Sequence, residues 1–241
     1  MRNTTTIALR EFKSYLASPM AYVVTGIFLM LTGFFFQSSP STYSETSING
    51  FLAWGSILLL LLASVLTMRL LAEERKMGTL ELLLTAPVRD SEVIVGKFLG
   101  SLGILTVMLA LTFYYPILLG VIPGIGFGDP DIGPIVTGYL GLFLLGCTSL
   151  AVGLFASSLT SNQIVAAVVA GGILCALWFL DMAADLLPEA LGEVISYLSL
   201  YYHFPDFMRG VIDTRGIIYY LSITVLFLFL AIRSLESSRW S

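Results

Sequence analysis

Six apolar runs follow one another along this sequence, and each is long enough to cross a membrane as a helix. A helix needs about 20 apolar residues to span the hydrocarbon core of a bilayer. The predicted spans cover approximately residues 20–37, 51–71, 93–122, 132–157, 163–181 and 216–233. We therefore predict an all-α polytopic membrane protein with six transmembrane helices, in which residues 1–241 form a single transmembrane domain.

The N-terminal segment, residues 1–18, alternates apolar and polar residues with the period of a helix. Apolar residues such as Ile7 and Phe12 recur against the basic residues Arg10 and Lys13. This pattern is typical of an amphipathic helix that lies on the membrane surface with its basic residues toward the lipid headgroups. We predict such a helix before the first span.

A second amphipathic segment lies between the fifth and sixth spans. After Pro188, the apolar residues Leu191, Val194, Ile195 and Leu198 recur at helical spacing. The pattern predicts a half-inserted helix on the membrane face opposite the N-terminal segment.

Breaks and close packing are predicted inside two of the spans. Pro116 should interrupt the third span, because proline removes a backbone donor. In the fourth span, Gly138, Gly141, Gly146 and Gly153 would let a neighbouring helix approach closely.

Composition excludes a water-soluble domain. Hydrophobic residues make up 57% of the chain and charged residues only 12%, and the mean hydropathy is +0.91. A soluble domain carries about 25% charged residues. The net charge of −4, with no basic patch, argues against a nucleic-acid partner. Cys147 and Cys175 lie inside apolar runs and are predicted to be small buried hydrophobes.

The basic residues predict which side of the membrane is cytoplasmic. Three precede the first span, five lie from Arg69 to Lys97, and two follow the sixth span. With six spans these ten residues all fall on one side, which the positive-inside rule assigns to the cytoplasm. The turn at residues 158–163 must also be cytoplasmic, although it carries no charge. We predict that both termini are cytoplasmic.

Residues that could carry chemistry are few. The sequence has one histidine, no G-x-x-x-x-G-K-[ST] phosphate-binding loop, no G-x-S-x-G motif and no cluster with metal-ligand spacing. His203 is either a ligand-sensing or proton-relay residue or a member of an interfacial aromatic cluster. Asp181 and Asp185, one helical turn apart at the outer end of the fifth span, could bind a cation or a substrate amine, or lie at a solvated helix end. We predict no catalytic, cofactor or metal site.

The segment after the second span, residues 73–88, is charged but also contains an apolar block. Leu80, Leu83 and Leu84 share one helical face, and Pro87 ends the pattern. A short helix here would either dock its leucines into a groove on another protein or lie flat on the lipid surface.

The same segment has the pattern Glu-x-x-x-Gly-Thr-Leu-Glu-x-Leu-Leu-x-x-Pro-Val, from Glu74 to Val88. It resembles the first cytoplasmic loop of ABC-2 type transporter permeases. The six spans, the N-terminal helix and the outer helical region are also similar to that family. Within the family, residues 10–19 and 207–215 most resemble the gliding-motility-associated permease GldF and its relatives, with the NosY-like permeases next.

The resemblance implies that the chain is the permease subunit of an ATP-driven exporter in the plasma (inner) membrane. It implies a homodimer or heterodimer of permeases and two separate ABC ATPase subunits, which bind ATP and Mg. It also implies an accessory extracytoplasmic protein as a partner and no enzyme activity in this chain. The residues that match the family's ATPase-coupling helix are Glu73, Glu74, Arg75, Gly78, Thr79, Glu81, Leu82 and Leu83.

In this interpretation the second span is a continuous helix that transmits the movement of the ATPases. Gly78 would break or reorient the coupling helix, and Glu81 would meet basic groups on the ATPase. The alternative from another class is a non-transporting scaffold or anchor of a motility or secretion assembly. An intramembrane enzyme would need polar residues converging at membrane depth, and the sequence offers few.

Overall fold

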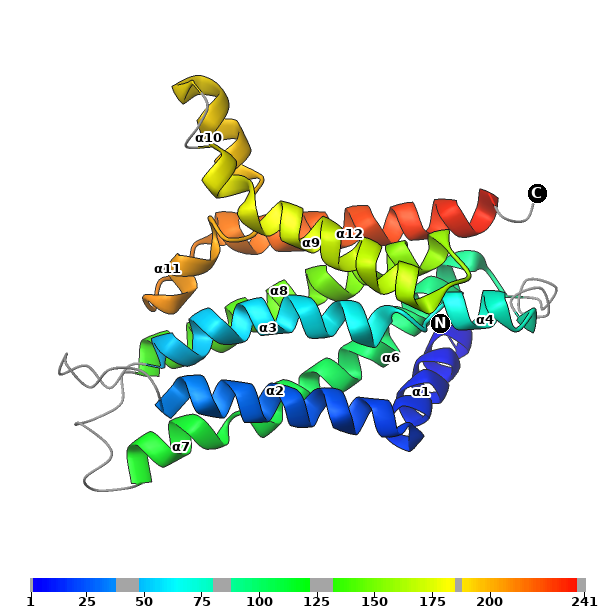
Figure 1. Cartoon of the computed structure of the whole chain (residues 1–241), viewed down its shortest axis with the longest axis horizontal. Coiled ribbons are helices and arrows are strands. Elements are labelled where there is room, and N and C mark those ends of the chain that lie inside the picture. Colours follow the sequence, from blue (N-terminus) through cyan, green and yellow to red (C-terminus); the bar gives the residue numbers. More distant parts are fainter. Residues whose placement is uncertain (1, 38–47, 80–87, 122–131, 185–187, 238–241) are drawn as a thin grey trace.

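The computed structural model describes residues 2–37, 48–79, 88–121, 132–184 and 188–237, and these residues form helices without strands (Figure 1). The helices, in chain order, are α1 (Arg2–Ala17), α2 (Pro19–Gln37), α3 (Asn49–Thr67), α4 (Ala72–Lys76), α6 (Asp90–Leu111), α7 (Tyr114–Val121), α8 (Ile132–Leu159), α9 (Gln163–Ala184), α10 (Glu189–Tyr197), α11 (Phe204–Met208) and α12 (Thr214–Ser237).

Six segments of the described chain are long and apolar enough to cross a membrane, which confirms the predicted all-α polytopic fold. They are Pro19–Phe36, Asn49–Lys76, Asp90–Ile117, Ile132–Leu159, Gln163–Ala184 and Thr214–Ser237. Each overlaps one of the six predicted spans. The amphipathic helices predicted before the first span and after Pro188 are also present, as α1 and α10.

The helices form a bundle with two distinct ends (Figure 1). At one end lie α1, α4 and the last turns of α12, and at the other lie α7, α10 and α11. We call the first of these the termini end. The predicted grouping of the termini with the charged segment after the second span is therefore present in the bundle.

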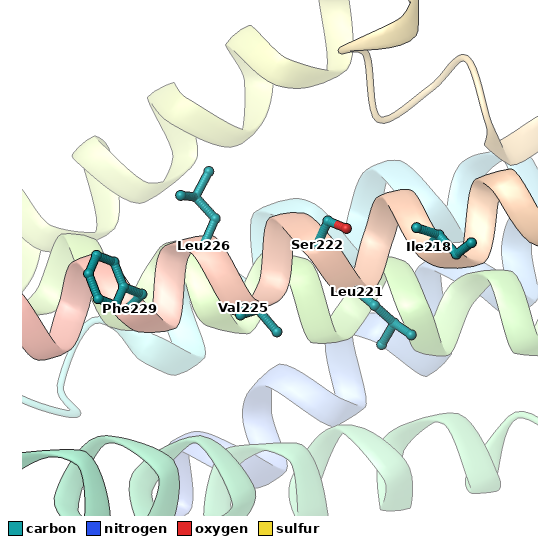
Figure 2. Close-up of a pocket in the computed structure, with 6 residues that line it drawn as sticks. All are labelled: Ile218, Leu221, Ser222, Val225, Leu226 and Phe229. Carbon is teal, nitrogen blue, oxygen red and sulfur yellow. The ribbon is translucent and has the colours of Figure 1, made fainter.

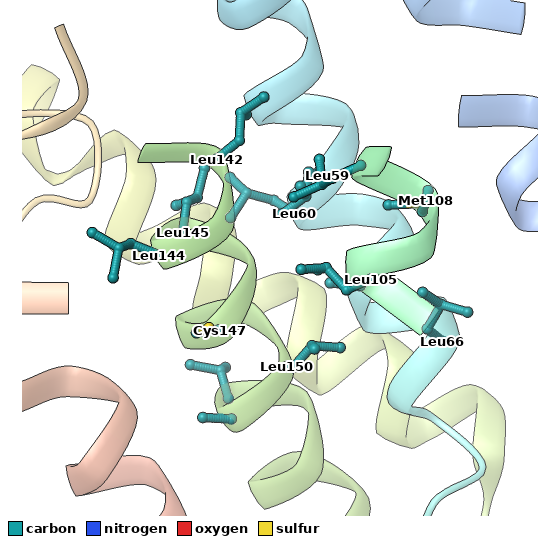
Figure 3. Close-up of a cluster of buried hydrophobic side chains, with 14 of the residues drawn as sticks. Leu59, Leu60, Leu66, Leu105, Met108, Leu142, Leu144, Leu145, Cys147 and Leu150 are labelled. Carbon is teal, nitrogen blue, oxygen red and sulfur yellow. The ribbon is translucent and has the colours of Figure 1, made fainter. Parts of the chain in front are cut away.

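The core of the bundle is built around α8. This helix contacts α3, α6, α9, α11 and α12, and nearly all of its residues from Thr137 to Ser158 are buried. Figure 3 shows its side chains meeting those of α3 and α6 in one apolar cluster, which includes Leu59, Leu60, Leu105, Met108, Leu142, Leu145 and Leu150.

The predicted close packing along α8 is present at Gly153. A Cβ atom there would overlap the side chain of Thr67, at the end of α3. Because glycine presents only hydrogen, the backbones of α3 and α8 come close at this crossing.

The third span is interrupted where its proline requires it. Helix α6 ends at Leu111, and α7 begins at Tyr114 with Pro116 in its first turn. Pro116 has no N–H to donate to the carbonyl of Thr112, four residues earlier. That carbonyl accepts instead from the N–H of Tyr115 at 3.0 Å and from the hydroxyl of Tyr139, on α8, at 2.8 Å.

Helix α3 is continuous over Asn49–Thr67, but it does not continue into α4, so a turn separates the second span from the coupling segment. The chain forms a turn over residues 68–71 between α3 and α4. Ser157 of α8 satisfies the backbone at this turn, because its hydroxyl oxygen accepts from the N–H groups of Leu71 and Ala72 at 3.0 Å each. It also donates to the carbonyl of Met68 at 3.2 Å. No residue type signals this break, since residues 68–71 contain neither glycine nor proline.

The outer face of α12 is apolar and open. A groove on it is lined by six residues of this one helix (Figure 2): Ile218, Leu221, Ser222, Val225, Leu226 and Phe229. None of these six residues is charged, so this face is suited to contact lipid chains or another apolar helix. The six residues do not form a catalytic or metal-binding group.

We expect Gly153→Ala to lower the free energy of unfolding by about 1–3 kcal/mol, the usual cost of overpacking a tight contact. Thermal unfolding in detergent micelles measures this. Gly172→Ala is the matched control, because a Cβ at Gly172 of α9 meets nothing within 4 Å. The control should be neutral or slightly stabilising, since alanine favours a helix over glycine. Equal effects of the two variants would contradict the tight crossing of α3 and α8.

Candidate functional site

The predicted coupling residues begin on α4, at the termini end. Glu73, Glu74 and Arg75 belong to this helix, which starts directly after the turn that follows α3. Glu81, Leu82 and Leu83 lie outside the described residues. The structure therefore places the first half of the predicted coupling segment.

Gly78 lies just beyond α4, in a conformation that other residues rarely adopt. Its φ is +70°, and its N–H donates to the carbonyl of Arg75 at 3.3 Å. A left-handed glycine after the last helical residue is a common way to end a helix. The hydroxyl of Thr79 then donates back to the carbonyl of Glu74 at 3.3 Å. Gly78 thus redirects the chain as it leaves α4.

The link between α3 and α4 is attached to α1 through Arg69. Its guanidinium lies 4.4 Å from the centre of the Tyr15 ring and donates to the hydroxyl of Ser18 at 2.8 Å. The Tyr15 hydroxyl in turn donates to the carbonyl of Leu66 at 2.7 Å. Burial raises the pKa of Tyr15, so that its hydroxyl stays protonated and remains a donor. The end of α3 is therefore held against the junction of α1 and α2.

Lys97 of α6 is the most deeply buried charge at this end. Its side chain is 3% exposed, and its ammonium group lies 2.8 Å from Glu74 of α4 and 3.4 Å from Glu11 of α1. We call Glu11, Glu74 and Lys97 the ion-pair cluster. Three helices that are far apart in the sequence thus meet at one ammonium group.

In the sequence, Lys97 stands out only as the end of the charged segment. The signal that could have identified it is its position one turn or more inside an apolar helix, since a charge at that depth must find a partner. What the sequence could not show was which carboxylates would reach it.

Helix α1 fits into a row of glycines on α6. Gly96, Gly100 and Gly103 lie on one face, and a side chain at these positions would overlap Ile7, Glu11 or Phe12 of α1. Close packing was predicted from the small residues of the fourth span, whereas this row of glycines in the third span was not predicted.

Only part of α1 is free to lie on a membrane surface. Tyr15 is buried and Ile7 is partly buried, whereas Leu9, Arg10 and Lys13 are exposed. The exposed face keeps the pattern that predicts contact with headgroups, and the other face packs against α6.

At the opposite end of the bundle the predicted acidic pair is only half described. Asp181 is partly exposed near the end of α9, and Asp185 lies outside the described residues. Within the described chain, no group of three or more His, Cys, Asp or Glu side chains could hold a metal ion. Because Asp185 is not among the described residues, the pairing of Asp181 with Asp185 stays a prediction.

His203 belongs to an aromatic cluster that connects α9, α12 and the turn between α10 and α11. Its ring stacks on Tyr219 with centroids 4.2 Å apart, and its Nδ1 lies 3.4 Å from the carbonyl oxygen of Ser199. The Ser199 hydroxyl donates to the carbonyl of Trp178, and the Tyr220 hydroxyl donates to that of Leu200. Of the two interpretations of His203, this geometry favours the aromatic cluster.

Comparison with models of protein families matches residues 5–203 to the ABC-2 family transporter protein. The match covers α1, the segment around α4 and the chain as far as His203. No curated protein matches the chain.

We expect acid to destabilise the cluster around His203. Burial lowers the pKa of His203, with smaller opposing effects from the Ser199 carbonyl and from Asp213 and Asp206. Between the lowered pKa and the ordinary value of 6.5, the unfolded chain binds more protons than the folded chain. The stabilisation is therefore complete above pH 6.5 and decreases as the pH falls below it. The other titratable groups in ring contact with His203 are Tyr197, Tyr202, Tyr219 and Tyr220.

Thermal unfolding at pH 7.5 and 5.5 measures this effect in wild type and in His203→Phe, which keeps an aromatic ring for stacking. His203 is the single histidine of the chain, so no other imidazole titrates in this range. The melting temperature of wild type should fall more than that of the variant. An equal fall in both would exclude His203 as the cause.

Proposed function

The chain belongs to the ABC-2 family of transporter proteins, and from this premise we propose that it is the permease subunit of an ATP-driven exporter whose ATPase docks at α4. It is a multi-pass membrane protein and the permease component of an ABC transporter. A permease of this family has no ATPase site of its own. In our proposal, two separate ABC ATPase subunits bind ATP and Mg and supply the energy.

The observation that carries this proposal is the attachment of α4 to the rest of the bundle. Helix α4 carries the charged half of the coupling pattern, and Glu74 on it is ion-paired to Lys97, inside the third span. Lys76 and Met77, at its end, are exposed. A short helix that is open on one side and anchored on the other is suited to receive a partner and to pass its movement into the membrane.

The break between α3 and α4 changes how that movement would travel. A continuous helix would push along its own axis. Here, displacement of α4 acts on three attachments: the turn at residues 68–71, Ser157 of α8 and Lys97 of α6. Movement of the ATPase therefore acts first on α8 and α6, which belong to the core, and through them on the rest of the bundle.

We further propose that the termini end faces the cytoplasm and that the membrane is the plasma membrane. The concentration of basic residues at this end supports the orientation. A second permease copy, identical or related, would complete the transporter, with an accessory protein on the outer side. The apolar spans suit a lipid-like or otherwise hydrophobic substrate. The finer resemblance to GldF and NosY permeases stays a prediction.

The test is capture of the ATPase by the full chain. The tagged chain is purified in mild detergent from the cells that naturally make it, and the preparation is assayed for ATP hydrolysis and for labelling by a photoreactive ATP analogue. We expect an ATPase with a phosphate-binding loop to co-purify. Purification without such an ATPase would favour the scaffold hypothesis.

In our proposal the docking site includes α4 and the coupling residues that follow it in the sequence, and charge reversal at Glu81 tests that second part. We expect Glu81→Lys to reduce the amount of captured ATPase about tenfold or more, because a reversed charge in an interface costs several kcal/mol. Glu193→Lys is the control, since it makes the same change on an exposed residue of α10, at the opposite end. The control should capture ATPase like wild type. A normal yield with Glu81→Lys would mean that the ATPase docks elsewhere.

A further inference from the structure

The ion-pair cluster has one cation and two carboxylates, and the two carboxylates are not equivalent. Glu74 is the closer partner of Lys97, at 2.8 Å, and Glu11 lies within ion-pair range at 3.4 Å. All three groups are largely withdrawn from water, with side-chain exposures of 3% for Lys97, 17% for Glu11 and 26% for Glu74. A buried ammonium group without a partner is strongly unfavourable, so Lys97 must keep one carboxylate in any conformation.

Glu11 is held on the same rigid body as Lys97. Gly100 on α6 lies directly against Glu11, and Gly96 and Gly103 hold α1 on either side of it. Because Lys97 lies between two of these glycines, α1 and α6 keep Glu11 and Lys97 together when other helices move.

Glu74 is attached far less firmly. It lies on a helix of five residues that follows a turn. Its second carboxylate oxygen, Oε2, is buried without a hydrogen-bond partner among the residues that the structure describes. Among the described residues, Lys97 is therefore the partner that positions this side chain.

We propose that Lys97 is a positioning residue whose ammonium group exchanges Glu74 for Glu11 when α4 is displaced. In one state, in which α4 lies against α6, Lys97 binds Glu74 and holds α4 in place. In the other state, the released state, α4 is displaced from α6, and Glu11 keeps the ammonium group of Lys97 paired. This inference rests on the proposed function, in which α4 receives the movement of the ATPase.

The exchange explains why two carboxylates are needed. With Glu74 alone, displacement of α4 would leave a buried cation without a partner, which opposes the movement. With Glu11 in place, the cost of the movement is reduced to a change of partner. A purely structural cluster would instead hold all three helices together, and the loss of either glutamate would loosen α4.

Hydrogen exchange of the full chain in detergent or nanodiscs separates these two cases. We expect Glu74→Gln to increase the exchange rate of the backbone N–H groups of α4 about tenfold, a usual effect of losing a hydrogen bond to a charged group. We expect Glu11→Gln to leave this rate unchanged or to lower it. Faster exchange of α4 in both variants would overturn the proposal in favour of a structural cluster. Unchanged exchange in Glu74→Gln would overturn it as well.

ATP turnover by the captured complex supplies the second measurement. Glu11→Gln should lower the rate of ATP hydrolysis several-fold while the complex still assembles, because the released state has lost its carboxylate. A wild-type rate in this variant would overturn the exchange. If Lys97→Met folds, it should behave like Glu74→Gln. If Lys97→Met does not fold, the two glutamate variants alone test the exchange of partners. Glu236→Gln is the control, because it breaks an exposed ion pair with Arg233 at the same end of the bundle.

The two proposals fail in different ways. If α4 responds to the glutamate variants as expected but no ATPase is captured, the exchange exists in the chain and the proposed function is wrong. If the ATPase is captured but the variants do not show the expected asymmetry, the proposed function stands and the exchange is wrong.

Discussion

Lipid offers no hydrogen-bond partners, so every backbone group exposed by a break in a spanning helix must be satisfied by the protein itself. Among the residues that the structure describes, two spanning segments contain a turn, after α3 and after α6. Side chains of α8 supply hydrogen bonds at both breaks, in addition to backbone bonds within the turns: Ser157 accepts from the turn after α3, and Tyr139 donates to the carbonyl of Thr112. The most buried helix of the bundle is therefore what permits the two irregular segments, and the position of α4 depends on it.

The charged side chains at the termini end likewise need partners within the protein. Lys97 is drawn inside the bundle because carboxylates from α1 and α4 meet it there. Arg69 finds the face of Tyr15 and the hydroxyl of Ser18. These contacts join the N-terminal helix, the end of the second span and the start of the third into one unit. In the proposed mechanism, a movement of α4 would therefore act on three parts of the membrane domain.

Close packing of helices sets how rigid this unit is. The glycines on α6 admit α1 so closely that Glu11 and Lys97 share one framework. By contrast, α4 is five residues long and follows a turn. A rigid pair beside a weakly attached helix is the arrangement in which a small displacement changes ionic partners rather than deforming the core.

The sequence by itself determined the six spans, the amphipathic helices and the grouping of basic residues, because length, hydropathy and helical period are local properties. The break at Pro116 was also predictable from the sequence, because proline is itself a local signal. Only the tertiary structure decided that the chain turns at residues 68–71, that α1 lies on the glycines of α6, and that Lys97 binds Glu74 and Glu11. Each of these depends on groups far apart in the sequence, such as Ser157 for the turn, and hydrophobic periodicity carries no information about which distant groups will meet.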